Sequence, residues 1–155
     1  MNRTTKPNTP LGMQIREIMT RDVVTIHPEA SLTEAAQRMN ERDVGMLPVC
    51  EDNQVIGIVT DRDITIRAIA EGLDPNETQV REIMTPEVVY CIETEDVQDA
   101  VESMENRQIR RIVVLTHTQH LVGVLSIGDV AVDTGNQQLA GEVLQKVSEP
   151  EKVVH

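Results

Sequence analysis

Two short motifs in this chain place a hydroxyl group three residues before a carboxylate. Thr60 and Asp63 form the first pair, and Ser126 and Asp129 form the second. Each hydroxyl is predicted at the end of a strand, and each carboxylate in the first turn of the helix that follows. A carboxylate in this place can accept hydrogen bonds from both hydroxyls of a ribose. The motifs therefore predict ribose binding, but the same spacing also describes a helix N-cap that needs no ligand.

Three arginines near the motifs could hold the phosphate of a nucleotide. Arg110 and Arg111 precede the second motif, and Arg62 lies inside the first. A guanidinium presents a planar fork of donors to phosphate oxygens, and the free N–H groups at a helix start favour the same anion. The segment before the first motif, residues 44–47, is neutral, so the two motifs need not bind the same ligand. Ion pairing with nearby carboxylates is the alternative explanation of Arg110 and Arg111.

The base of a bound nucleoside would need an apolar slot here, because the chain offers no aromatic partner for stacking beyond its single tyrosine, Tyr90. Small apolar residues of the predicted strands could line such a slot, although the same residues would equally suit a plain core. The first slot would be lined by Val23, Val24, Val44, Met46 and Pro48. The second would be lined by Val88, Val89, Ile109 and Val113.

Other kinds of chemistry find little support in the sequence. Phosphate-loop and dinucleotide fingerprints are absent, and no catalytic triad or dyad can be defined, so we expect no enzyme activity. His117 and His120 fall in a predicted hairpin turn, which favours a solvated turn over a metal site. Cys50 and Cys91 are too few for a disulfide framework and are expected to be buried, but a thiol-based stress sensor stays open as an alternative.

Composition narrows the possible partners. The net charge of −12 argues against binding to duplex DNA, and the near absence of aromatic residues argues against stacking on single strands. No apolar run reaches the ~20 residues of a membrane span, and the start of the chain lacks the pattern of a signal peptide. We therefore expect a cytoplasmic protein without nucleic-acid or membrane partners.

The two motifs lie at matching places in an internal repeat. Residues 15–20 return as 80–85, and residues 53–60 return as 119–126. The offset is 65 residues for the first pair of segments and 66 for the second. A duplicated unit of this size is a supersecondary module that buries too little apolar surface to be stable alone. We therefore expect the function to lie in the cleft between the copies.

Each copy is predicted to contain a strand, an amphipathic helix, a hairpin of two strands and a second helix. Ser31 and Glu34 form a predicted capping box, and Gly72 is predicted to end the second helix of copy one. A final helix after Gly135 should pack on its own module or on a second subunit. The predicted elements of copy one are 23–26, 32–42, 46–50, 55–60 and 61–71, and those of copy two are 88–92, 97–107, 111–116, 121–126 and a helix from 127. The final helix carries Leu139, Val143, Leu144 and Val147 on one face.

These motifs together resemble the CBS domain. The resemblance rests on Ile-Met-Thr followed by a Val-rich strand, on "VGMLPV", and on Gly followed by two apolar residues and Thr/Ser-x-x-Asp. It spans residues 14–134. The match is strongest in "LPVCEDNQVIGIVTDRDI". It implies a stand-alone bacterial CBS pair, or Bateman module, of the α/β class, with small mixed sheets around a pseudo-two-fold axis. The implied domains are an arm at 1–13, CBS units at 14–73 and 80–134, a linker at 74–79 and a tail at 135–155.

The resemblance also implies a function. A CBS pair of this kind would be a regulatory module that binds AMP, ADP or ATP, or else S-adenosylmethionine or a dinucleotide, with the adenine in the two apolar slots, and signals to a partner protein. It would need no obligatory cofactor and would form a homodimer, for which the helices at 32–42 and 97–107 could supply an apolar patch. The alternative is a homodimeric interaction protein whose two ribose motifs are only helix caps.

Overall fold

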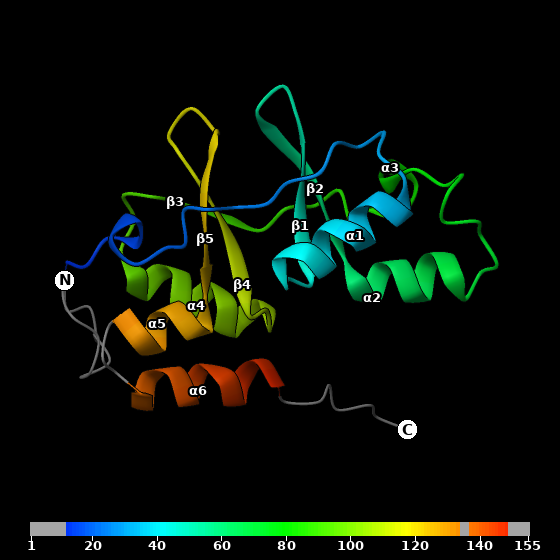
Figure 1. The fold of residues 1–155 in the computed structure, drawn as a ribbon. Coiled ribbons are helices and arrows are strands. Elements are labelled where there is room, and N and C mark those ends of the chain that lie inside the picture. The colour runs from blue at the N-terminus through cyan, green and yellow to red at the C-terminus, as the bar shows by residue number, and fades with distance from the viewer. Residues whose placement is uncertain (1–11, 134–136, 149–155) are drawn as a thin grey trace. The chain divides into compact units, whose positions relative to one another are not determined.

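The computed structural model describes residues 12–133 and 137–148, which form two compact units (Figure 1). Unit 1 combines residues 12–21 with 90–118, 122–133 and 137–148, whereas unit 2 combines 22–89 with 119–121. Each unit therefore joins the opening segment of one repeat copy to the strands and helices of the other. Most of the predicted arm at 1–13 and both ends of the predicted tail at 135–155 lie outside the described residues.

Unit 2 is built on an antiparallel hairpin. Strands β1 (Met46–Glu51) and β2 (Gln54–Thr60) pair with Met46 opposite Thr60. Asp52 and Asn53 form the turn with φ values of 52° and 64°, a conformation that Asp and Asn tolerate. The helical elements are α1 (Leu32–Arg42), α2 (Asp61–Asp63), the π-helix η2 (Ile64–Ile69) and α3 (Val80–Ile83). The core of this unit contains Ile26, Leu32, Ala35, Met39, Leu47, Val49, Val59, Ile64, Ala68, Val80 and Ile83.

Unit 1 holds a three-stranded sheet with the order β3-β4-β5, in which β3 runs parallel to β4. Helix α6 packs on both α4 and α5 (Figure 1). The α/β fold with two small sheets is confirmed. The strands are β3 (Tyr90–Ile92), β4 (Arg111–Leu115) and β5 (Leu121–Ser126), and the helices are the short 3-10 turn η1 (Ile15–Glu17), α4 (Val97–Arg107), α5 (Ile127–Asp133) and α6 (Gln137–Ser148).

Three predicted elements differ from the structure. The strand expected at 23–26 is reduced to one parallel bridge between Ile26 and Val49, because Ile26 alone exchanges backbone hydrogen bonds with β1. The strand expected at 88–92 begins only at Tyr90. The helix expected at 61–71 turns into the π-helix η2 after its first turn, and Gly72, at φ +75°, follows its end as predicted.

Helix starts follow the sequence more closely. Ser31 caps α1 by accepting a hydrogen bond from the Glu34 N–H at 3.1 Å, but the Glu34 carboxylate pairs with Arg38 instead of closing the capping box.

The predicted dimer patch on the helices at 32–42 and 97–107 is wrong, because neither α1 nor α4 exposes a large apolar side chain. On α6, Val143 is buried as predicted, whereas Leu144 is 45% exposed.

The predicted linker at 74–79 is well tied to unit 2. Thr78 is buried and its hydroxyl donates to the Asp74 carbonyl at 2.8 Å, while the Leu32 N–H donates to the Thr78 carbonyl at 3.0 Å. The Thr33 hydroxyl also donates to the Asn76 side chain. These bonds hold the chain between the two copies against the start of α1. No helix among residues 12–133 and 137–148 is long and apolar enough to cross a membrane.

The exchange of opening segments depends on a glycine in each hairpin. In unit 1, Thr20 and Val124 exchange backbone hydrogen bonds of 2.9 and 3.0 Å, and in unit 2 Thr85 and Ile58 do the same at 2.9 Å. Gly123 lies beside the first of these bridges. The missing side chain there allows the Met19-Thr20 backbone to reach β5, which carries the Ser126 motif.

Replacing Gly123 with alanine should therefore destabilise the protein. The added Cβ would lie 2.6 Å from Met19 Sδ and 2.9 Å from the Thr20 carbonyl oxygen. Because this carbonyl belongs to the backbone bridge, the strand must shift, and we expect the free energy of unfolding to fall by about 1–3 kcal/mol. Urea unfolding measures the change.

Gly141→Ala in α6 is the matched control, since nothing lies within 4 Å of an added Cβ there. It should leave the free energy of unfolding unchanged or raise it by up to ~1 kcal/mol, the difference in helix propensity. If both variants lost the same stability, close approach at Gly123 would not be the cause.

Candidate functional site

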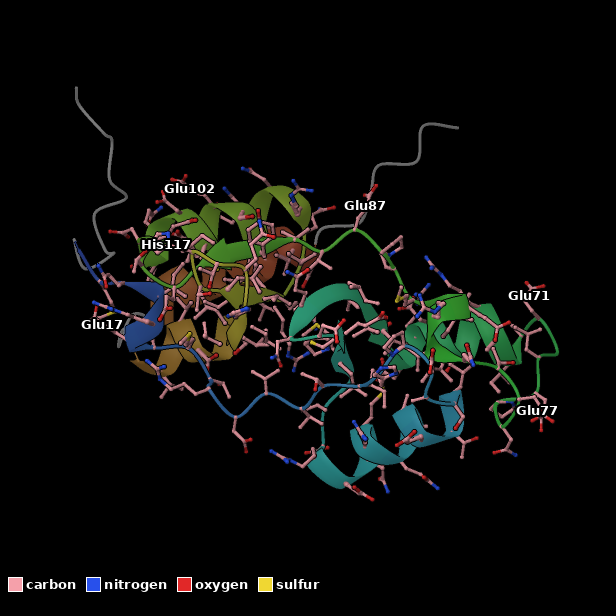
Figure 2. All side chains as sticks on the ribbon, turned by 90° about the horizontal axis from the view of Figure 1, so that it is seen from above. Glu17, Glu71, Glu77, Glu87, Glu102 and His117 are labelled. Atoms are coloured by element: carbon pink, nitrogen blue, oxygen red, sulfur yellow. The ribbon has the colours of Figure 1, made fainter. Side chains whose placement is uncertain are left out.

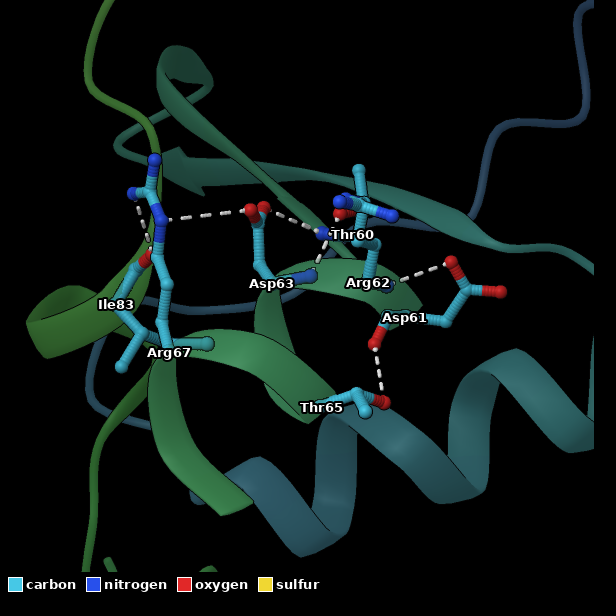
Figure 3. Close-up of polar contacts among 7 residues, drawn as sticks. All are labelled: Thr60, Asp61, Arg62, Asp63, Thr65, Arg67 and Ile83. Atoms are coloured by element: carbon cyan, nitrogen blue, oxygen red, sulfur yellow. Dashed lines mark hydrogen bonds and ion pairs between the residues drawn. The ribbon is translucent and has the colours of Figure 1, made fainter. Parts of the chain in front are cut away.

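The first hydroxyl-carboxylate pair forms a reciprocal cap at the start of α2 (Figure 3). The Asp63 N–H donates to Thr60 Oγ1 at 3.0 Å, and the Thr60 N–H donates to Asp63 Oδ2 at 3.0 Å. The other carboxylate oxygen, Oδ1, lies 3.7 Å from Arg67 Nε. Arg67 also donates to the Ile83 carbonyl at 3.3 Å, so a cation already neighbours this carboxylate.

The second pair has the same cap geometry in unit 1. The Asp129 N–H donates to Ser126 Oγ and the Ser126 N–H donates to Asp129 Oδ2, both at 3.0 Å. Here the neighbour is neutral, since the Thr20 hydroxyl lies 3.2 and 3.3 Å from the two carboxylate oxygens and donates to them. A carboxylate offers about four acceptor positions, so capping leaves room for ligand hydroxyls. A ribose approaching Asp129 would need to displace only a threonine hydroxyl.

The segments preceding the two motifs are bonded to them in the same way but carry different charges. In unit 2 the Asp61 N–H donates to the Gly45 carbonyl at 3.0 Å, and in unit 1 the Ile127 N–H donates to the Arg110 carbonyl at 3.1 Å. The Asp61 carboxylate lies close to Gly45, because a Cβ on that glycine would be 2.9 Å from Asp61 Oδ2. Unit 2 thus has the Asp61 carboxylate at the position where unit 1 has Ile127, and the residue bonded to Ile127 is an arginine, Arg110.

The three candidate phosphate residues are exposed. Arg110 directs Nη2 to Ser148 Oγ in α6 at 3.1 Å, so its observed partner is a hydroxyl. Arg111 begins β4, the strand that follows. Arg62 lies on α2, and its N–H donates to Asp61 Oδ1 at 2.8 Å (Figure 3). Of the two candidate arginines in unit 1, Arg110 is the one whose backbone carbonyl is bonded to the residue after Ser126, whereas Arg62 lies within the cap of unit 2.

The residues of the first predicted adenine slot belong to the same unit as Thr60 and Asp63. Four of them are half-buried, whereas Pro48 is buried. The residues predicted for the second slot are divided, because Val88 and Val89 belong to unit 2 and Ile109 and Val113 to unit 1. Val113 is only 2% exposed, which is the position of a core residue. The half-buried residues of the first slot are Val23, Val24, Val44 and Met46.

Sequence reasoning missed four residues of these sites. Thr20 is separated from Asp129 by 109 residues, so no local pattern could indicate their contact. Arg67 follows Asp63 at helical spacing, which is a signal that could have been used. Asp61 and Ser148 become relevant only once the chain has folded against Gly45 and Arg110.

Neither cysteine has the properties of a redox sensor. Burial raises the pKa of the Cys50 thiol, and burial together with the Glu95 carboxylate raises the pKa of Cys91 to about 12. A reactive thiol needs a lowered pKa, so the stress-sensor alternative loses its support.

In the part of the chain that the structure describes, the histidine of the hairpin turn does not take part in a metal site. His117 is exposed and lies 3.1 Å from the Thr94 hydroxyl. Among residues 12–133 and 137–148, no three His, Cys, Asp or Glu side chains gather as a metal site would require.

The surface is acidic, as the net charge of −12 implies. Figure 2 labels five exposed glutamates, which lie in helical elements and in connecting segments of the two units. An anionic ligand is repelled by such a surface unless a local group of cations offsets the repulsion. Arg110 and Arg111, which are adjacent in the sequence and exposed, are the candidates for such a group. The five glutamates are Glu17, Glu71, Glu77, Glu87 and Glu102.

Comparison with known proteins adds a family to this geometry. The pattern that defines the CBS domain matches residues 15–68 and 80–132. Hypoxic response protein 1 of Mycobacterium tuberculosis is 38% identical over 117 residues, which cover 75% of this chain and 81% of that protein. A crystal structure of Hypoxic Response Protein I with two coordinated zinc ions has a TM-score of 0.70 at 37% identity and covers 77% of this chain and 97% of that one.

Two further solved structures contain adenosine compounds. The CBS domain protein PAE2072 from Pyrobaculum aerophilum, complexed with AMP, has a TM-score of 0.72 at 26% identity and covers 86% of this chain and 99% of that one. The CBS domain pair of protein MJ0100, in complex with 5′-methylthioadenosine and S-adenosyl-L-methionine, has a TM-score of 0.70 at 25% identity and covers 81% of this chain and 98% of that one.

Proposed function

This chain belongs to the CBS domain family, and we propose that it is a regulatory module that binds AMP at the Ser126-Asp129 pair. One observation carries the proposal: the cap and the phosphate candidate adjoin, because the residue after Ser126 is bonded through its N–H to the Arg110 carbonyl at 3.1 Å. The proposed ribose carboxylate and the proposed phosphate arginine thus belong to segments that are hydrogen-bonded to each other in one unit. The complexes of PAE2072 with AMP and of MJ0100 with two adenosine compounds support an adenosine ligand.

In the proposed complex the ribose hydroxyls replace the Thr20 hydroxyl on Asp129. The cap bonds from Ser126 stay in place, so the carboxylate is already oriented when the ligand arrives. Hydrogen bonds to this ionised acceptor are about twice as strong as those between neutral groups, and a ribose brings two hydroxyl donors where Thr20 brings one, which favours the exchange. The process is binding without a chemical step, and the ligand acts by favouring one conformation of the module over another for a partner protein to detect.

Charge decides which adenosine compound this site prefers. Arg110 and Arg111 favour an anionic tail, so AMP, ADP or ATP should bind better than the sulfonium of S-adenosylmethionine. At the Thr60-Asp63 pair, compounds with a phosphate should bind less well than those without one, because the Asp61 carboxylate lies close to Gly45 and repels phosphate. We therefore propose one phosphate-binding site per chain, in unit 1.

Titration calorimetry with adenosine, AMP, ADP, ATP and S-adenosylmethionine tests the function. We expect AMP to bind with about one site per chain and more tightly than adenosine. If none of the five compounds produced heat or raised the melting temperature, the proposal would be wrong. The alternative of an interaction protein with two purely structural caps would then be favoured.

We also propose that the protein is a homodimer. A group of exposed apolar side chains that could contribute lies on and after the π-helix η2, where Ile66, Ile69 and Leu73 are 50%, 53% and 41% exposed. Light scattering at micromolar concentration should give a mass near twice 17.3 kDa. Ile69→Glu should lower that mass, whereas a monomeric wild-type protein would contradict the proposal.

A further inference from the structure

Helix α6 is anchored at its C-terminal end to the segment that borders the Ser126-Asp129 pair. Lys146 Nζ lies 3.3 Å from Glu105 Oε2, and Gln108 Nε2 donates to the Lys146 carbonyl at 3.3 Å. Two residues on, Ser148 Oγ accepts a hydrogen bond from Arg110 Nη2 at 3.1 Å. Val143 of this helix is buried, at 1% exposure. The polar contacts thus converge on residues 105–110.

Comparison of the two repeat copies indicates that α4 is adapted to receive α6. Val101 of α4 is fully buried, whereas its counterpart in α1, Ala36, is exposed. One turn later the Glu105 side chain is only 7% exposed, whereas its counterpart Asn40 is exposed. Val101 and Glu105 share one face of the helix, since they are four residues apart. This face of α4 is therefore covered, whereas the corresponding face of α1, at Ala36 and Asn40, is exposed.

Arg110 belongs to both the docking site of α6 and the proposed phosphate site. Its carbonyl holds the first N–H of α5, and its guanidinium holds Ser148. We propose that AMP and the C-terminal end of α6 compete for Arg110, so that phosphate binding loosens α6 from α4. This inference rests on the proposed function. In this proposal the docking of α6 depends on whether AMP is bound. Once α6 is released from α4, its buried face becomes available to a partner.

Linkage fixes the size of the effect. If α6 docking weakens AMP binding by some factor, AMP must weaken α6 docking by the same factor. One hydrogen bond is at stake, so we expect a factor of roughly two to ten. Adenosine carries no phosphate and should bind without disturbing the contact between Arg110 and Ser148.

Hydrogen–deuterium exchange on the full-length protein tests the inference. Saturating AMP should speed exchange of the backbone amides of residues 138–148 by roughly two- to tenfold, and saturating adenosine should leave it unchanged. Ser148→Ala should speed the same exchange in the free protein and tighten AMP binding by a similar factor, with adenosine affinity unaltered. Gln145→Ala, at an exposed position of the same helix, is the control and should change neither quantity.

The results distinguish a failure of the competition for Arg110 from a failure of AMP binding itself. If AMP binds but α6 exchanges at the same rate or more slowly, the competition is wrong while the nucleotide site stands. Unchanged AMP affinity in Ser148→Ala would also overturn it. If wild-type protein binds no AMP, the proposed function and the competition both fail.

Discussion

Replacing Asp129 with alanine should weaken AMP binding by about 1.5–3 kcal/mol, or roughly ten- to more than a hundredfold, because hydrogen bonds to a charged group are lost. In the structure this carboxylate accepts hydrogen bonds from the Ser126 N–H and from the Thr20 hydroxyl. The ribose hydroxyls are proposed to take the place of Thr20, so no other group of the cap can substitute for the carboxylate. Titration calorimetry below the melting temperature of the variant measures the loss.

The same substitution removes a helix cap, which separates the two explanations of the motif. Loss of the cap should lower the free energy of unfolding by ~0.5–2 kcal/mol whether or not a ligand binds. Asp129→Asn keeps an oxygen for the Ser126 N–H but removes the charge, so it should retain more stability than alanine while still binding AMP weakly. If Asp129→Ala melted earlier but bound AMP like the wild type, the pair would be a cap only.

Asp63→Ala is the matched control from unit 2. It breaks an equivalent cap, with the same two hydrogen bonds of 3.0 Å, and should cause a comparable loss of stability. Because Asp61 disfavours phosphate near that pair, AMP affinity should stay close to that of the wild type. Equal losses of AMP binding in the two variants would show that both pairs bind the nucleotide.

Local sequence was sufficient wherever a structure depends on near neighbours. The caps at Ser31, Thr60 and Ser126 are contacts across three residues, and each was predicted from residue type and spacing. The hairpin of the strands predicted at 46–50 and 55–60 is local for the same reason, since Asp52 and Asn53 between them adopt the required positive φ. Helices α1 and α4 followed from their apolar spacing.

Pairing between distant segments could not be predicted in this way. The predicted strand at 23–26 has apolar residues of the right kind, but only Ile26 finds backbone partners on β1. The bridge between Thr20 and Val124 joins the two repeat copies, and a repeat alone does not say whether a segment pairs within its own copy or with the other. That exchange brings Thr20 to Asp129, so the most informative contact of the site depends on tertiary structure.

The two arginines provide the last prediction. Arg110→Ala combined with Arg111→Ala should make the protein bind adenosine and AMP about equally, whereas wild-type protein should prefer AMP by roughly ten- to a hundredfold, the range for charge-assisted contacts. The preference should shrink at high ionic strength, because exposed charges are screened over about 10 Å at 0.1 M salt. Calorimetry with both ligands at low and high salt measures it.

Single variants assign the preference to one residue. Arg110→Ala should reduce AMP affinity and also loosen α6, because it removes the partner of Ser148, whereas Arg111→Ala should reduce AMP affinity alone. Arg62→Ala, in unit 2, should leave AMP affinity unchanged, since that arginine adjoins the Asp61 carboxylate instead of the Ser126 cap. If wild-type protein bound AMP and adenosine equally at low salt, the arginines would have no phosphate role, and Arg110 would serve only to anchor α6.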